Sequence, residues 1–116
     1  MSRFQREWYS EQELETRCRR CGIRPLWLAD RELLPPADSS DGGQPMWRAT
    51  TARAWVYGLA VSVLVYDPEK RKREIQAQRE HYQRYIGGAP LPDSVFERDV
   101  YRSFAVRTVR RFFGEL

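Results

Sequence analysis

The sequence predicts a mainly α-helical single domain, a small bundle of about five helices with residues 50–66 as its buried centre. Three observations lead to this fold class. Helix start signals recur along the chain, and glycine or proline follows most of the segments that they open. Residues 54–66 form the longest run without a charged side chain, which indicates a core element. With 41% apolar content, residues 1–116 are long enough to form one core.

The first predicted helix covers residues 11–21 and begins with a capping box. In such a box, the hydroxyl group of Ser10 and the carboxylate of Glu13 each bind a free backbone N–H group at the helix start. Acidic residues lie in the first turn and arginines in the last, which suits the helix dipole at both ends. Gly22 then supplies the conformation that commonly ends a helix.

A second, short helix is predicted over Pro25–Leu34, because proline is favoured at the first helical position and the two prolines that follow cannot continue it. A strand over Ile23–Leu28 is the alternative interpretation. Residues 35–46 are rich in proline, glycine, serine and aspartate, and they contain little to bury. We expect this stretch to be a mobile surface loop.

Residues 50–66 are predicted as a helix because their length exceeds that of most strands. Four valines favour a strand instead, so an α+β fold with a strand over residues 59–66 is the alternative. Apolar residues fall on every side of the helical wheel, which predicts a helix covered all round. A membrane span is disfavoured, because thirteen helical residues extend only about 20 Å and the hydrocarbon layer is about 30 Å thick.

Two further helices are predicted in the rest of the chain. Asp67 and Pro68 form a strong start signal, and Gly87 ends the helix that they open. The apolar stripe of this helix is narrow, so most of its surface is expected to be solvated. The last helix covers Ser94–Phe113 and carries apolar residues on three sides. Such a helix is either wedged between neighbours or holds a binding partner.

The net charge of +4 arises entirely from residues 51–116. Eighteen of the twenty basic side chains are arginines, whose planar guanidinium groups suit bidentate contact with phosphate or carboxylate. A nucleotide bias of the coding genome explains the same excess. The charge pattern therefore suggests a macromolecular partner without identifying its class.

Two basic segments are the candidates for contact with a partner. The first is the run of four cations over residues 70–73, in the helix that Asp67 and Pro68 open. An ordinary solvated first turn of a helix explains this run equally well. The second belongs to the last helix, where no acid interrupts residues 100–114 and aromatic residues lie beside arginines, although plain core packing produces the same pattern. The predicted partner-binding residues are Lys70, Arg71, Lys72, Arg73, Arg98, Arg102, Arg107, Arg110, Arg111 and Phe112.

Cys18 and Cys21 have the Cys-x-x-Cys spacing of half a zinc site. A closed site needs two more ligands, and the single histidine, His81, lies sixty positions further along the chain. A zinc ion shared by four cysteines across a dimer axis is therefore the metal-binding alternative. A redox role is disfavoured, because the dipole at a helix C-terminus opposes a thiolate. The favoured interpretation is that both are small core residues.

The sequence offers no nucleophile elbow, Gly-rich phosphate loop or pair of metal-binding histidines, so we expect no enzyme, no cofactor and no small-molecule substrate. The favoured function is a non-enzymatic accessory protein that binds a protein partner, such as an inhibitor or assembly component of a phage or mobile element. Nucleic-acid binding through the basic second half is one alternative, and a zinc-stapled homodimer is the other. The N-terminus resembles no secretory signal, which predicts a cytoplasmic protein without membrane contact.

Overall fold

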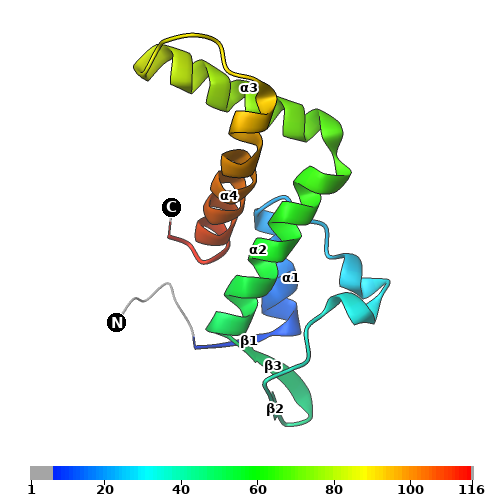
Figure 1. Cartoon of the computed structure of the whole chain (residues 1–116). Coiled ribbons are helices and arrows are strands. Elements are labelled where there is room, and N and C mark those ends of the chain that lie inside the picture. The colour runs from blue at the N-terminus through cyan, green and yellow to red at the C-terminus, as the bar shows by residue number, and fades with distance from the viewer. Residues whose placement is uncertain (1–6, 116) are drawn as a thin grey trace.

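The computed structural model describes residues 7–115 and confirms a mainly helical fold, to which it adds a small sheet that the sequence analysis missed (Figure 1). Within these residues there are four α-helices, so a bundle of about five helices is not confirmed. The helices are α1 (Glu11–Arg20), α2 (Ala49–Tyr66), α3 (Pro68–Tyr85) and α4 (Asp93–Phe112), and the strands are β1 (Trp8–Ser10), β2 (Ser39–Asp41) and β3 (Gln44–Arg48).

The segment predicted as one helix over residues 25–34 forms two separate 3-10 turns, η1 (Leu26–Leu28) and η2 (Arg31–Leu33). Asp30 separates them, because its backbone is extended at φ −134° and ψ 97°. Its carboxylate accepts a hydrogen bond from the N–H group of Glu32 at 3.1 Å. Aspartate competes for backbone amides in this way and therefore starts a new turn instead of continuing the old one. Neither the continuous helix nor the alternative strand is formed.

The stretch predicted as a loop over residues 35–46 contains most of a β-hairpin. Strands β2 and β3 pair antiparallel, and Gly42 and Gly43 form the turn between them at φ 58° and 85°. Two positive φ angles are typical of a type I′ turn, which glycine adopts without strain. β1 pairs with the other edge of β3, and this register places Tyr9 opposite Trp47, both of them buried. Trp47, which directly follows the predicted loop, stabilises the hairpin by its burial. The polar composition of residues 35–46 gave no sign of this contact.

The central segment is helical as predicted, and the alternative strand over residues 59–66 is wrong. The prediction that this helix is covered all round is also wrong, because its buried residues form a single stripe at every fourth position. Trp55 and Leu59 beside this stripe are partly buried against the larger core, and the side of α2 that lies away from it meets water. Tyr66 at the end of α2 is 84% exposed. The buried residues are Ala52, Val56, Ala60 and Leu64.

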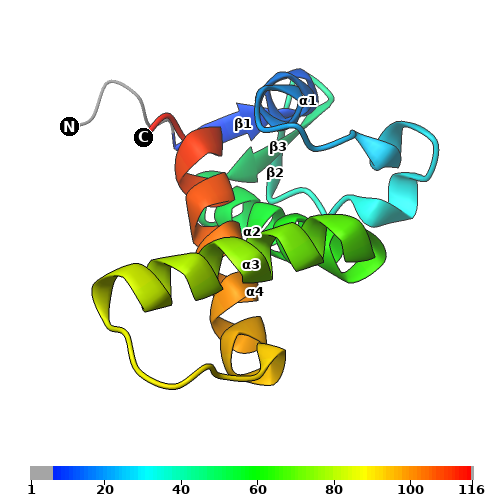
Figure 2. The same cartoon turned by 90° about the horizontal axis from the view of Figure 1, so that it is seen from above.

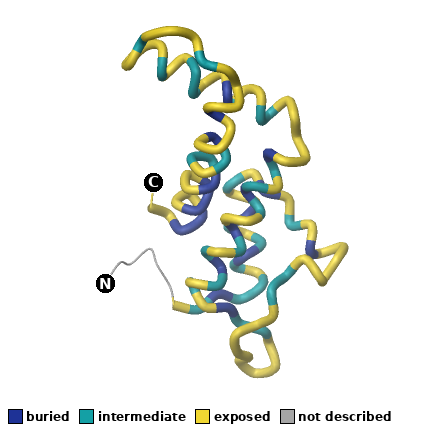
Figure 3. The backbone as a smooth tube through the Cα atoms, in the orientation of Figure 1, coloured by how far each residue is buried: buried dark blue, intermediate teal, exposed yellow. Residues whose placement is uncertain are grey.

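The molecule is elongated because α3 lies across the ends of α2 and α4 (Figure 1, Figure 2). Its dimensions are 59 × 35 × 19 Å. The radius of gyration of 16.7 Å exceeds the value of about 13 Å expected for a compact chain of this length. Much of α3 and of the segment that follows it is consequently exposed (Figure 3).

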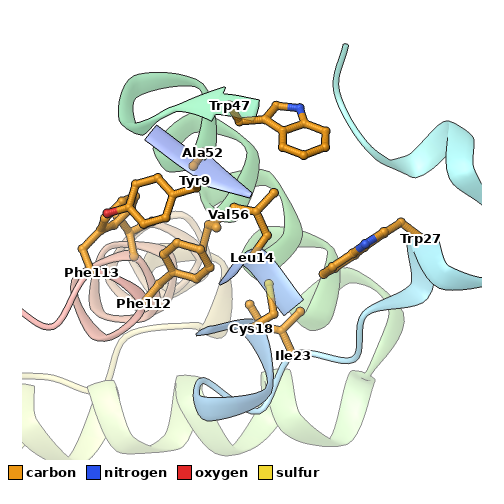
Figure 4. Packing of buried hydrophobic residues seen from close by; sticks show 11 residues of the cluster. Tyr9, Leu14, Cys18, Ile23, Trp27, Trp47, Ala52, Val56, Phe112 and Phe113 are labelled. Atoms are coloured by element: carbon orange, nitrogen blue, oxygen red, sulfur yellow. The ribbon is translucent and has the colours of Figure 1, made fainter. Parts of the chain in front are cut away.

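Buried residues form two separate clusters. The larger one joins the sheet, α1, η1, the first half of α2 and the end of α4 (Figure 4). The smaller one joins α3 to α2 and α4, and it is extended by Tyr82, whose ring packs edge-on against Phe96 with the ring centres 5.8 Å apart. Its buried members are Leu64, Ile75, Phe96 and Val100. α3 is therefore attached to the rest of the molecule through the smaller cluster.

Candidate partner-binding surface

The basic run at the start of α3 does not form one surface, because its side chains leave the helix in different directions. The ammonium group of Lys70 lies 5.3 Å from the ring centre of Phe104 on α4. Arg71 instead turns back to α2, where its guanidinium group donates hydrogen bonds to the carbonyl oxygens of Leu64 at 2.9 Å and Val65 at 3.2 Å. Both cations hold α3 to its neighbours, and Arg71 satisfies carbonyl groups that the end of a helix leaves open.

The other two cations of the run face water. Lys72 forms an exposed ion pair with Glu69 at 3.8 Å. Arg73 is exposed, and it makes no ion pair within the described part of the chain. Because Ile75, two positions later, is buried towards α4, Arg73 lies on the opposite side of α3. The run therefore adds no continuous basic patch to the surface of α4.

Arg107 links α4 to α3. Its guanidinium group donates a hydrogen bond to the carboxylate of Glu74 at 2.8 Å. Arg79 makes a comparable link in the opposite direction, from α3 to the start of α4, through an ion pair with Asp93. The sequence analysis did not identify Arg79, because the partners of such a pair lie far apart in the chain. The two ion pairs add polar links between α3 and α4 to the apolar packing of the smaller cluster.

Phe112, predicted to contact a partner, belongs to the core instead. Only 2% of this residue is exposed, and its ring packs against the rings of Tyr9 and Phe113 (Figure 4). Its carbonyl oxygen accepts a hydrogen bond from the guanidinium group of Arg17 at 2.8 Å. Phe112 thus anchors the end of α4 to α1 and β1, and it contributes nothing to an exposed surface.

The remaining predicted arginines stay exposed along α4. Two of them, Arg98 and Arg102, make no ion pair among residues 7–115 and lie between Val95 and Val106, which are about half exposed. Spacings of three and four residues place these side chains in one row on the outer side of the helix. We call Val95, Arg98, Arg102 and Val106 the α4 stripe. The exposed predicted arginines of α4, apart from Arg107, are Arg98, Arg102, Arg110 and Arg111.

A shallow groove runs beside the α4 stripe, between α4 and α3. Arg102, Val106 and Arg107 line it from α4, and Gln78 lines it from α3. Asp99 lies in the same groove, so the lining holds one acid together with two arginines. The structure therefore brings two of the predicted arginines together at one place, beside apolar surface and an acid. Helical spacing in the sequence predicts that the residues of the α4 stripe share one side of the helix. Only the packing of α4 shows that this side is exposed.

Cys18 and Cys21 lie at the end of α1, against the larger core. Cys18 is fully buried, and this burial raises the pKa of its thiol to about 12, with a further contribution from the nearby Cys21. The thiol of Cys21 is half-buried and donates to the carbonyl oxygen of Thr108 at 3.8 Å. The part of the chain that the structure describes holds no group of three or more His, Cys, Asp and Glu side chains suited to a metal ion. The positions of both thiols favour the interpretation as core residues, since a zinc ion shared between two chains would have to draw Cys18 out of the core.

Raising the pH above about 9 is expected to destabilise the fold through Cys18. The folded protein retains the Cys18 proton up to a pKa of about 12, whereas the unfolded chain releases it near the ordinary pKa of 9.0. The stabilising effect is complete below the unfolded pKa and is lost as the pH rises towards the folded one, at up to about 1.4 kcal/mol per pH unit.

Urea unfolding at a series of pH values up to about 11 measures this effect in the chain and in Cys18→Ala, which lacks the buried thiol. The variant should show the smaller fall in stability over this range. Equal slopes in the two proteins would mean that Cys18 titrates normally in the folded state.

No helix within residues 7–115 combines the length and the apolar character that crossing a membrane requires. The chain matches no protein-family model, and comparison with curated proteins and with solved structures finds no match either. A function for this chain must therefore be argued from its own surface.

Proposed function

We propose that this chain is a non-enzymatic binding protein and that the α4 stripe contacts a protein partner. The proposal rests on which side chains of α4 are exposed. The buried residues of α4 pack against α2, α3 and the larger core, whereas its outer side exposes two valines and two arginines, and these arginines form no ion pair within residues 7–115. Arginine beside apolar surface is enriched at the centres of protein interfaces.

The surroundings of the stripe support a protein partner over nucleic acid. Asp99 lines the groove beside Arg102, and Glu97 is exposed next to Arg98. Carboxylates in these places repel a phosphate backbone but can pair with the basic groups of a polypeptide. A nucleic-acid-binding surface also gathers its cations on one face, whereas here Arg73 faces away from α4.

Removing the two arginines of the stripe is expected to reduce recovery of the partner at least tenfold. Arginine side chains at interface centres contribute about 2 kcal/mol or more, and 1.4 kcal/mol already corresponds to a factor of ten. The experiment recovers proteins from the native cell with the tagged chain and quantifies each of them by mass spectrometry for the original protein and for Arg98→Gln combined with Arg102→Gln.

The matched control is Arg73→Gln combined with Arg84→Gln. It removes the same charge from exposed arginines of α3, which also lack ion pairs in the described residues. The proposal predicts that the control keeps the partner and that both double variants unfold like the original protein. Equal loss of the partner from both variants would show that net charge, and not the α4 stripe, mediates binding.

A salt titration separates the nucleic-acid alternative from the protein-binding proposal. Binding to mixed-sequence duplex DNA and to RNA is measured from low to physiological ionic strength. We expect at most weak binding that disappears at physiological salt. Contacts with phosphates release bound counterions, and this release contributes less free energy as the salt concentration of the solution rises. Tight binding that persists at physiological salt and is weakened by both double variants would favour nucleic acid as the partner.

A further inference from the structure

A second surface lies on the side of α2 that faces away from α4. Here the segment that follows α1 runs beside the second half of α2 (Figure 1, Figure 2). Between them is an apolar groove of about 380 Å³, which is at the small end of the range of about 300–1,000 Å³ for ligand pockets. Its apolar lining consists of Ile23, Leu26, Leu59, Val63 and Tyr66.

The local structure explains why the groove exists. Gly22 turns the chain at φ 75°, a conformation that glycine adopts readily, and the N–H group of Ile23 then donates to the carbonyl oxygen of Cys18 at 2.9 Å. Ile23 is thereby held in the core, but Leu26 is left 58% exposed. Across the groove, Tyr66 extends from the end of α2 and is 84% exposed. Two large apolar side chains thus lie on opposite sides of the groove, and no residue among positions 7–115 covers them.

The polar rim of the groove is predominantly positive. Arg24 is exposed and makes no ion pair in residues 7–115. Lys70 lines the opposite rim at the start of α3, and its ammonium group lies 5.3 Å from the ring centre of Phe104. Asp67 is the single acid of the lining, and its carboxylate already accepts a hydrogen bond from the backbone N–H group of Lys70 at 3.0 Å, as a helix cap does. With two cations against one carboxylate, the rim carries a net positive charge, which favours an anion.

We infer that this groove binds an acidic segment of a protein partner, which inserts one large apolar side chain between Leu26 and Tyr66 and directs a carboxylate towards Arg24. The volume suits one or two side chains, and the exposed Arg24 at the net positive rim selects the charge of the residues beside them. This site is separate from the α4 stripe and uses none of its residues. It requires only that the chain binds protein, and it stands independently of which partner the stripe contacts.

Selection of twelve-residue peptides from a random display library against the full chain tests the inference. Enriched sequences should combine leucine, phenylalanine or tryptophan with aspartate or glutamate close by. Fluorescence polarisation then measures the affinity of the synthetic peptide of highest enrichment. Tyr66→Ser and Arg24→Glu are each expected to weaken its binding at least tenfold.

Two variants serve as matched controls, because each makes the same chemical change at an exposed position outside the groove. Tyr85→Ser and Arg84→Glu, near the end of α3, should leave the affinity of the peptide unchanged. Replacing the acidic residue of the peptide by lysine should weaken binding to the original protein and restore binding to Arg24→Glu. This exchange distinguishes a direct charge contact from a general change in the fold.

Three outcomes would overturn the inference: no enriched peptide, enriched peptides without acidic residues, or binding that Tyr66→Ser and Arg24→Glu do not affect. A fourth outcome would also overturn it, and sedimentation equilibrium detects that outcome. If the original protein is a dimer and Tyr66→Ser is a monomer, a second copy of the chain covers the groove. Arg98→Gln combined with Arg102→Gln should leave the peptide affinity unchanged. Failure at the groove is therefore distinguishable from failure of the α4 stripe.

Discussion

Replacing Phe112 by alanine is expected to lower the free energy of unfolding by about 3–5 kcal/mol, a large part of the stability of a domain of this size. The Phe112 ring is buried between the end of α4, β1 and α1, with its centre 6.3 Å from that of Tyr9 and 4.8 Å from that of Phe113. Removing the ring leaves a cavity between α4, β1 and α1. These three elements come from separate parts of the chain and cannot all move in to fill it. The expected loss is therefore at the upper end for a core substitution.

Urea unfolding followed by circular dichroism measures the effect, and Val106→Ala is the control. Val106 lies on the same helix but is about half exposed, so its truncation should change the stability by no more than about 0.5 kcal/mol. If Phe112→Ala were as stable as Val106→Ala, Phe112 would not be buried in solution, and its exclusion from the partner-binding surface would have to be withdrawn.

Replacing Leu64 by alanine is expected to cost about 2–5 kcal/mol, with the loss concentrated in α3. Leu64 is fully buried and is one of the four buried residues of the smaller cluster, which holds α3 against α2 and α4. The larger cluster does not include it. Because the two clusters share no buried residue, weakening one should open α3 locally before the rest of the molecule unfolds.

Amide hydrogen exchange resolves the two regions. In Leu64→Ala, amides of α3 should exchange at least tenfold faster, while those of α1 and β3 change much less. Val65→Ala, at the neighbouring half-exposed position, should leave both regions close to the original protein. An equal loss of protection in α1 and α3 would show that the two clusters unfold as one cooperative unit.

The candidate surfaces show how far residue patterns reach. The exposed arginines of α4, apart from Arg98, lie in the stretch without acids between residues 100 and 114. The same pattern led to the prediction that Phe112 binds a partner, but this residue is buried. An aromatic residue beside an arginine has the same sequence pattern in a core as at an interface. The apolar groove was not predicted at all. Its two sides come from segments about forty positions apart, and neither segment carries a pattern of its own.

The sequence by itself determined the local features of this protein. The capping box at Ser10 is formed, with the N–H group of Glu13 donating to the Ser10 hydroxyl at 3.3 Å, and Asp67 with Pro68 begins α3 as predicted. These signals depend on hydrogen bonds between residues three or four positions apart, so a short stretch is sufficient to specify them.

Only the tertiary structure decided which sides of these helices meet water and which cations remain available. Arg107 pairs with Glu74 across 33 positions, and Arg17 binds the carbonyl group of Phe112 across 95. Such contacts depend on the angle at which α3 crosses α2 and α4, and that angle follows from the packing of the smaller cluster. The exposed α4 stripe and the groove beside α2 are consequences of that packing, and no local pattern in the chain specifies them.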